Sequence, residues 1–252
     1  MIRILLGGCS GAMGHAVAKA AAQRDDIEVT AGVDLRDDGT CAFPVFPSFP
    51  AVTSEADVII DFSHPSCLDG LLEFAREHGV PAVLCTTGYD DAQTARIREA
   101  SAFVPILRSG NMSLGINLLS ELAKTAARVL GTSFDVEIVE AHHNRKLDAP
   151  SGTALMLERS VEEGLDYEPT LVYDRHDRRQ KRDRHEIGMH AIRGGTIVGE
   201  HEIIFAGNDE IIRLSHTALS RNVFAVGALN AAAYLPGKAP GMYDMSDVIA
   251  DK

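Results

Sequence analysis

The sequence predicts an α/β protein in which a doubly wound parallel sheet is followed by a second α+β domain built on an open mixed sheet. Apolar runs typical of buried strands alternate with helical patterns up to about residue 107, as expected of a parallel sheet with helices on both faces. A glycine-rich loop at residues 8–14 joins the first strand pattern to the first helix pattern. Several strand patterns then lie between residues 134 and 214, which predicts the second sheet.

The length and composition fit a globular protein with one large domain or two modest ones. The chain has 252 residues and a mass of 27.1 kDa, with 45% hydrophobic and 24% charged residues. Its formal net charge of −12 argues against nucleic acid or an anionic membrane as a partner. A small anionic substrate is still compatible with this charge, because a local basic cluster can outweigh the mean.

The N-terminal residues and the absence of a long apolar run favour a cytoplasmic location. The chain begins directly with the strand-like residues 2–6, and no apolar run approaches the roughly 20 residues that a membrane helix needs. The cysteines match no zinc spacing; they are Cys9, Cys41, Cys67 and Cys85. We therefore expect reduced thiols and no metal site.

The first elements have the pattern of a nucleotide-binding unit. Residues 2–6 form a short apolar run typical of a buried parallel strand, and Gly8, Gly11 and Gly14 follow it. Glycines permit a tight turn and let the backbone approach a pyrophosphate at the start of the next helix. The spacing is GxxGxxG rather than the common GxGxxG, so the glycines alone are weak evidence.

The next strand supplies the second half of the nucleotide-binding pattern. Residues 27–33 end in Asp34, 20 residues after Gly14, where dinucleotide-binding folds place a carboxylate that accepts hydrogen bonds from the ribose. The pattern therefore predicts a Rossmann-type domain. A carboxylate there repels a 2′-phosphate, and Leu35 follows where a phosphate-binding site would prefer Arg, although Arg36 is near. We expect NADH to be used at least as well as NADPH.

Three further strand patterns continue the sheet, at residues 57–62, 80–85 and 103–107, with helical stretches near 66–78 and 90–102. Small and polar residues follow each of these strands: Ser63, His64 and Pro65, then Thr86, Thr87 and Gly88, then Ser109, Gly110 and Asn111. The carboxyl ends of parallel strands form the binding edge of an open α/β sheet. Ordinary loops would explain one such cluster more easily than three.

The second half begins with a long amphipathic helix pattern at residues 114–130. Further strands are predicted at 134–140, 170–173, 187–192, 202–205 and 210–214, with a helix ending near 163 and another at 224–233. Residues 175–184 contain six Arg or Lys together with two Asp and a His. Their mixed sign, without interleaved aromatic residues, favours a solvated loop over a nucleic-acid site.

Residues 140–154 have the densest chemistry in the chain. They contain His142, His143, Arg145, Lys146, Ser151, Gly152 and Thr153, directly before a helical pattern. A helix N-terminus offers unpaired N–H groups and a positive dipole end, so the segment predicts proton donors beside a carboxylate or phosphate site. Each residue alone could be an ordinary surface or helix-start residue. Their concentration after a strand favours a functional site.

The whole chain resembles the dihydrodipicolinate reductase family. Residues 140–154 are similar to its signature E-x-H-H-x-x-K-x-D-A-P-S-G-T-A, and residues 193–201 to its R-x-G-x-I-V-G-E-H. Three shorter stretches and the glycine loop resemble further family motifs, at residues 61–63, 86–88, 111–115 and 8–14. The resemblance implies an enzyme of the diaminopimelate route to lysine that reduces a cyclic imine dicarboxylate with NADH or NADPH.

The resemblance also implies roles for the site residues. Hydride passes to C4 of the conjugated imine, and the enamine is then protonated at C3; Lys146 matches the donor of that proton and His142 its acid/base partner. The implied substrate-binding positions are His143, Ser151, Gly152 and Thr153. The implied cofactor-binding positions are Gly8, Cys9, Ser10, Gly11, Ala12, Met13, Asp34, Phe62, Cys85, Thr86, Thr87, Ser109, Gly110, Asn111 and Met112. Cys85 and Met112 replace a usual glycine and a usual aromatic residue.

The resemblance further implies a homotetramer built by the second sheet, with the last helix returning to the first domain. We expect a dinucleotide-binding domain at residues 1–112 together with 219–252. The substrate-binding and oligomerisation domain is expected at residues 113–218.

Three alternatives compete with this interpretation. Another two-domain dehydrogenase, such as an amino-acid dehydrogenase, would lack the specific segment at 140–154. A metal-dependent hydrolase or lyase would use His142, His143, His190 and His201, but adjacent histidines are poor joint ligands and no H-E-x-x-H motif is present. A non-catalytic NADH sensor would not need Lys146 and His142 for its activity.

Overall fold

The computed structural model describes residues 1–251, which form two compact units. The first unit contains Met1–Leu114 and the segment that begins at Arg221, and the second contains Gly115–Ser220. Each unit has its own sheet and its own buried apolar core.

A parallel seven-stranded sheet runs through the first unit. In spatial order its strands are β12 (Gly241–Tyr243), β6 (Pro105–Arg108), β5 (Ala82–Leu84), β4 (Val58–Asp61), β1 (Ile2–Gly7), β2 (Ile27–Val33) and β3 (Val45–Phe46). The strand order reverses between β1 and β4, because β2 lies on one side of β1 and β4 on the other. Open α/β sheets bind ligands at such a point, outside the carboxyl ends of the strands.

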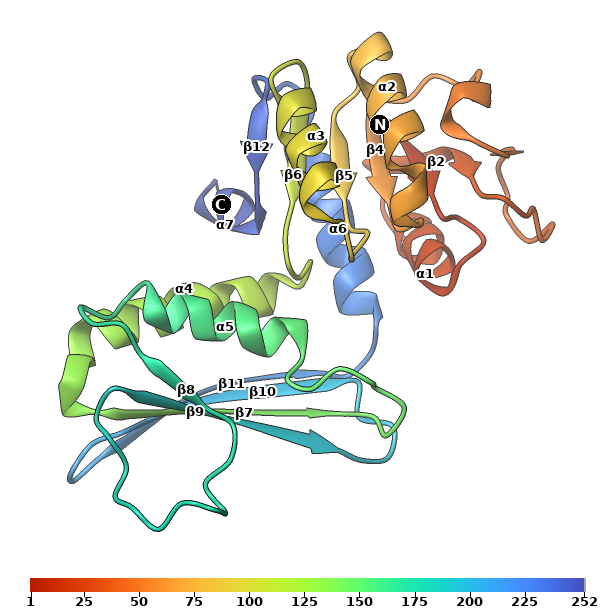
Figure 1. Cartoon of the computed structure of the whole chain (residues 1–252). Helices are drawn as coiled ribbons and strands as arrows, with labels where there is room; N and C mark the ends of the chain where they lie inside the picture. The colour runs from red at the N-terminus through yellow and green to blue at the C-terminus, as the bar shows by residue number, and fades with distance from the viewer. Residues whose placement is uncertain (252) are drawn as a thin grey trace. The chain divides into compact units, whose positions relative to one another are not determined.

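Helices cover both faces of this sheet (Figure 1). One face packs against α1 (Ala12–Ala21), α6 (Asn222–Tyr234) and α7 (Met245–Ala250), and the other against α2 (Leu68–His78) and α3 (Asp91–Ser101). Two short 3₁₀ helices, η1 (Phe49–Ala51) and η2 (Pro65–Cys67), lie in the connections. Leu5 and Leu6 are both fully buried but belong to opposite cores, because successive side chains of a strand point to opposite faces.

The strands and helices predicted for the first unit are confirmed, with small shifts at their ends. The strand predicted at residues 27–33 coincides with β2. The prediction missed β3 and β12, which have two and three residues, and α7, which has six. Elements this short show no hydrophobic periodicity, so the sequence pattern does not reveal them.

The second unit is built on a mixed five-stranded sheet, as predicted. Its spatial order is β11 (Ile211–Ala218), β10 (Gly199–Ala206), β7 (Asp135–His142), β9 (Glu186–Arg193) and β8 (Thr170–Val172). The central strand β7 is antiparallel to β10 and parallel to β9. Helices α4 (Leu114–Leu130) and α5 (Gly152–Glu162) cover one face (Figure 1), and α4 has the predicted bounds. A short η3 (Gly131–Ser133) joins α4 to β7.

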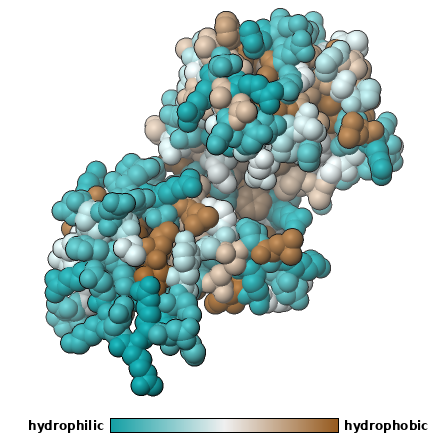
Figure 2. All heavy atoms as spheres, viewed as in Figure 1, coloured by the Kyte–Doolittle hydropathy of each residue, from teal (hydrophilic) through white to brown (hydrophobic). Residues whose placement is uncertain are grey.

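The surface shows no extended apolar belt in the view of Figure 2, where apolar residues form small separate groups among hydrophilic ones. Among the helices that the structure describes, none has the length and apolar character needed to cross a membrane. All four cysteines are free thiols.

Candidate functional site

Two close backbone approaches shape the glycine loop between β1 and α1. Gly8 has a φ of +73°, and a Cβ there would lie 2.5 Å from the carbonyl oxygen of Phe62. A Cβ at Gly14 would lie 2.3 Å from the carbonyl oxygen of Gly8. Both positions therefore require glycine. Gly11 precedes α1, whose start carries no side-chain cap, as expected of a helix N-terminus that receives an anion.

A hollow of about 570 Å³ lies beside this loop. Gly8, Gly11, Asp34 and Phe62 line it, together with residues of η1 and η2. The Asp34 carboxylate accepts hydrogen bonds from the backbone N–H groups of Ser10 at 3.1 Å and Arg36 at 3.3 Å. The acid and the glycine loop thus share one hollow, and this arrangement fits the ribose and pyrophosphate of a dinucleotide.

A second hollow, of about 390 Å³, lies at the carboxyl ends of β5 and β6. Its lining includes four predicted cofactor-binding residues: Thr86, Thr87, Ser109 and Gly110. The buried Asp61, at the end of β4, anchors this edge by accepting hydrogen bonds from Thr86 at 2.7 Å and Tyr89 at 3.4 Å. Burial raises the pKa of Asp61 above the ordinary range of an aspartate.

The other predicted cofactor-binding residues differ in exposure. Ser10, Ala12, Met13, Phe62, Cys85 and Asn111 are exposed or half-buried. Cys9 and Met112 are buried, and their side chains pack in the apolar core that contains α1 and α6. We therefore expect these two residues to contact a cofactor only through the backbone. Burial raises the pKa of the Cys9 thiol to about 12, so it is protonated at neutral pH.

The predicted catalytic segment starts at the last residue of β7, His142, and continues as a turn. The Lys146 N–H donates to the carbonyl of His143 at 3.1 Å, and the Lys146 ammonium lies 2.9 Å from the Asp148 carboxylate. The segment ends where α5 begins. Gly152 is exposed at the first helical position, where the N–H groups have no intrahelical acceptor.

A buried polar cluster, here called the inner cluster, surrounds His142; it consists of Glu140, His142, Ser151, Arg193 and His201. The fully buried Glu140 has its Oε2 2.6 Å from His142 Nδ1, and its Oε1 accepts from the Ser151 N–H at 3.1 Å. Both terminal nitrogens of Arg193 donate to this carboxylate, at 2.8 and 2.7 Å. Strand register brings these residues together, because His142 pairs with Arg193 and Glu140 with His201.

His201 borders a further side of His142 in an edge-to-face contact, with 5.2 Å between the ring centroids. Its Nε2 lies 3.1 Å from the hydroxyl of Ser151, which also accepts from the Ala154 N–H and so caps α5. Burial and the neighbouring His142 lower the pKa of His201 to about 4, so this ring is neutral at pH 7. The Ser151 hydroxyl is thus engaged within the unit, whereas Gly152 is exposed and Thr153 half-buried.

The charge of Glu140 is secured by its partners. Burial opposes ionisation, but the hydrogen bonds from Arg193 and His142 outweigh it and lower the pKa of this carboxyl. Glu140 is therefore ionised at neutral pH. On the other side of the imidazole, a Cβ at Gly199 would lie 3.2 Å from His142 Nε2, so the glycine leaves room beside this nitrogen.

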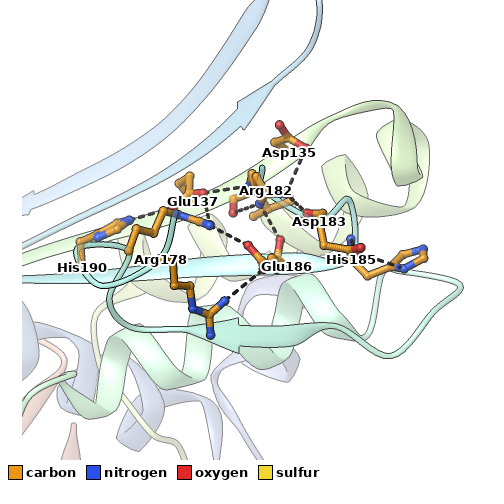
Figure 3. A network of polar contacts seen from close by, with 10 residues as sticks. Asp135, Glu137, Arg178, Arg182, Asp183, His185, Glu186 and His190 are labelled. Carbon is orange, nitrogen blue, oxygen red and sulfur yellow. Dashed lines mark hydrogen bonds and ion pairs between the residues drawn. The ribbon is translucent and has the colours of Figure 1, made fainter. Parts of the chain in front are cut away.

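The opposite face of the same sheet carries the outer cluster, which consists of Glu137, Arg175, Arg182, Glu186 and His190. Figure 3 labels four of its members: Glu137, Arg182, Glu186 and His190. Glu137 accepts from Arg175 at 3.0 Å and Arg182 at 3.1 Å, and it lies 2.8 Å from His190 Nε2. The expectation of a solvated loop at 175–184 is wrong for Arg182, whose side chain is only 17% exposed. Arg182 donates to backbone carbonyls of β7 and β9 and so fastens the loop to the sheet.

Sequence reasoning proposed His142 and Lys146 as catalytic residues but did not propose roles for the residues that surround His142. Glu140 stands inside the recognised segment, and Arg193 and His201 stand in the second motif at residues 193–201. The similarity of both stretches to family motifs was the only signal that they act together. Among residues 1–251, no group of three or more His, Cys, Asp or Glu side chains is arranged to hold a metal ion.

Comparison with known proteins gives two matching family models. The model for dihydrodipicolinate reductase, N-terminus, matches residues 2–112, and that for dihydrodipicolinate reductase, C-terminus, matches residues 115–249. The 4-hydroxy-tetrahydrodipicolinate reductase of Clostridium novyi is 46% identical over 252 residues, which cover 100% of both chains. The enzyme of the same name from Caldanaerobacter subterraneus subsp. tengcongensis is 49% identical over 99% of this chain and 98% of its own.

Solved structures share the fold. The dipicolinate-bound dihydrodipicolinate reductase from Paenisporosarcina sp. TG-14 has a TM-score of 0.80 and 24% identity, and the match covers 97% of each chain. A scyllo-inositol dehydrogenase from Lactobacillus casei has a TM-score of 0.62 and 12% identity, over 99% of this chain and 93% of its own. The family models match both halves of the chain, and the two named relatives are nearly half identical over almost its full length. The chain therefore belongs to the dihydrodipicolinate reductase family.

Proposed function

We propose that this protein reduces 4-hydroxy-tetrahydrodipicolinate to tetrahydrodipicolinate with NADH or NADPH, in the diaminopimelate route to lysine. The full-length match to reductases of that name carries the proposal. Dipicolinate, the ligand named for the Paenisporosarcina structure, is a small dicarboxylate and supports the same class of substrate here.

The second unit supplies the proposed acid/base and substrate-binding groups. Lys146, paired with Asp148, protonates C3 of the enamine, and His142 exchanges a proton as its acid/base partner. Gly152 and Thr153, at the start of α5, bind a substrate carboxylate, because a helix N-terminus attracts an anion. His143 adds to substrate binding. Ser151 keeps this turn in place through its helix cap.

The first unit supplies the proposed cofactor site. When bound, the reduced nicotinamide supplies the hydride that C4 of the substrate accepts. Gly8 and Gly14 let the backbone approach the pyrophosphate, and Asp34 accepts hydrogen bonds from the ribose. Since this carboxylate repels a 2′-phosphate and Leu35 beside it is 84% exposed and uncharged, NADH is used at least as well as NADPH.

A homotetramer is part of the proposal. The face of the second sheet opposite α4 and α5 carries the apolar residues Val139, Ile192, Ile204 and Ile211, of which Ile192 and Ile211 are 51% and 57% exposed. An exposed apolar face of this kind favours association. Native mass spectrometry should give four times 27.1 kDa; a monomer at the assay concentration would contradict this part of the proposal.

The direct test mixes the purified protein with the fresh product of dihydrodipicolinate synthase and follows the absorbance of NADH and NADPH in parallel. We expect oxidation only when that substrate is present, with NADH at least as fast as NADPH. Clearly faster oxidation of NADPH would contradict the argument from Asp34 and Leu35. A protein that binds NADH but oxidises neither cofactor would act on another substrate or serve as a sensor.

A further inference from the structure

Glu140 is the one acidic group of the inner cluster, and the proposed function gives it no role. A fully buried carboxylate is expensive to desolvate and persists in a folded protein only where charged and polar partners surround it. Here the partners are the Arg193 guanidinium, the Ser151 N–H and the His142 ring. Three separate parts of the second unit therefore converge on this single side chain.

The contact between Glu140 and His142 determines where the ring carries its proton. An ionised carboxylate can only accept, so the hydrogen in the 2.6 Å contact belongs to His142 Nδ1. The two bonds from Arg193 keep the carboxylate ionised and hold it in place against the ring. In the neutral imidazole, Nε2 then carries the lone pair.

The surroundings of Nε2 suit proton exchange. Gly199 leaves room beside this nitrogen, and the His142 side chain retains 11% exposure. His201 borders the ring but is itself neutral, and its Nε2 is turned to the Ser151 hydroxyl. Nε2 is therefore the His142 nitrogen that is not hydrogen-bonded to Glu140.

We infer that Glu140 is a positioning residue: together with Arg193 it fixes His142 in the Nδ1–H tautomer and leaves Nε2 to exchange the proton. The carboxylate of a Ser-His-Asp triad acts on its histidine in the same physical way, by orienting the ring and stabilising its cation. The catalytic consequence rests on the proposed function. The tautomer is a property of the protein alone and is measurable without substrate.

Charged or titratable groups of several elements lie around the inner cluster. Glu140 lies on β7, Arg193 on β9 and His201 on β10, with its strand neighbour His216 on β11, and the turn adds Lys146 and Asp148. Among the acidic groups, Glu140 contacts the ring directly, whereas Asp148 is paired with Lys146. Glu140 is therefore the acidic group placed to determine which His142 nitrogen carries the hydrogen.

Glu140→Gln tests the inference. The amide preserves size and can still accept from the Ser151 N–H, but it removes the charge and can donate to Nδ1. We expect ¹⁵N spectra of the neutral ring to show the Nδ1–H tautomer in the wild type and the Nε2–H tautomer in the variant, with His142→Gln identifying the signals. The kcat should fall at least about 10-fold, with a smaller change in KM.

Glu137→Gln is the matched control. Glu137 lies on the same strand and also binds arginine and histidine, but on the opposite face of the sheet. It should leave the His142 tautomer and kcat unchanged, and Glu140→Asp, which retains the charge, should restore part of the lost rate.

The outcomes separate the inference from the proposed function. An unchanged His142 tautomer in Glu140→Gln would overturn the inference, and so would the same change of tautomer in Glu137→Gln. Should Glu140→Gln fail to fold, an Nε2–H tautomer in the wild type would still overturn it. If the tautomer changes as expected but no form of the protein reduces the substrate, the proposed function fails and the positioning role of Glu140 stands.

Discussion

The inner and outer clusters use the same kinds of side chain on opposite faces of one sheet. In each, a glutamate of β7 accepts hydrogen bonds from arginine and lies against a histidine: Glu140 with His142, and Glu137 with His190. The two glutamates are three residues apart, so the alternation of the strand turns them to opposite faces. In both, burial opposes the charge and the partners outweigh it, which lowers the pKa of the carboxyl.

The clusters differ in what surrounds the carboxylate. Glu140 is fully buried and contacts the Nδ1 of its histidine, whereas the Glu137 side chain is 22% exposed and contacts Nε2. The outer carboxylate ties the 175–184 loop to the sheet through Arg175 and Arg182. Figure 3 shows the contact between Glu137 and Arg182. The two histidines thus differ in the ring nitrogen that the carboxylate contacts, which is Nδ1 in His142 and Nε2 in His190.

One glycine lies beside each cluster, and the two glycines leave room for different groups. A Cβ at Gly188 would lie 1.6 Å from Glu137 Oε2, so this glycine makes room for the carboxylate that fastens the loop. A Cβ at Gly199 would instead lie 3.2 Å from His142 Nε2, beside the nitrogen that Glu140 leaves unoccupied. Gly188 thus leaves room for the Glu137 carboxylate, whereas Gly199 leaves room beside the His142 imidazole.

The largest expected difference is in activity. His142→Ala should lower kcat with 4-hydroxy-tetrahydrodipicolinate by about 100-fold or more, because a positioned acid/base group contributes roughly that much. His190→Ala should change kcat less than about 2-fold, because His190 lies on the opposite face of the sheet from His142. Steady-state kinetics of both variants would measure the contrast. Similar losses in the two variants would remove the functional distinction between the clusters.

A second difference is expected in stability. Arg193→Met leaves the fully buried Glu140 without its cation and should lower the free energy of unfolding by about 3 kcal/mol. Arg182→Met leaves Glu137 with Arg175 and partial exposure, so we expect about 1 kcal/mol. Urea unfolding, followed by circular dichroism because the chain has no tryptophan, would compare them. A larger loss in Arg182→Met would reverse the order of the two clusters.

The smallest expected effect is a pH dependence that originates in the inner cluster. Burial lowers the pKa of His201 from 6.5 to about 4, so the unfolded chain binds a proton that the folded protein does not bind between these values. The free energy of unfolding therefore has its full value above pH 6.5 and declines as the pH falls toward 4. The expected loss at pH 5 is about 2 kcal/mol.

The free energy of unfolding, measured at pH 7.5 and pH 5, tests this pH dependence. His201→Gln has no titrating ring and should lose less stability over the same interval. An equal loss in the variant and the wild type would assign the pH dependence to other groups.

Local patterns in the sequence were enough to predict most of the fold. Residues 27–33 and 114–130 show the periods of a strand and a helix because burial on one face imposes them, and both elements have the predicted bounds. The two- and three-residue strands β3 and β12 were missed because they are too short to show a period. The roles predicted for individual site residues remain predictions.

By itself, the sequence determined the alternation of strands and helices, the glycine loop with Asp34, and the segment from His142 to Lys146. These features are local, because their residues lie within one strand–loop–helix stretch of the chain. Only the tertiary structure decided that Arg193 lies beside His142 and His201 beside Glu140, and that Arg182 fastens a loop to the opposite face. Such contacts depend on the order and register of strands far apart in the sequence, which the periodicity of a single strand does not encode.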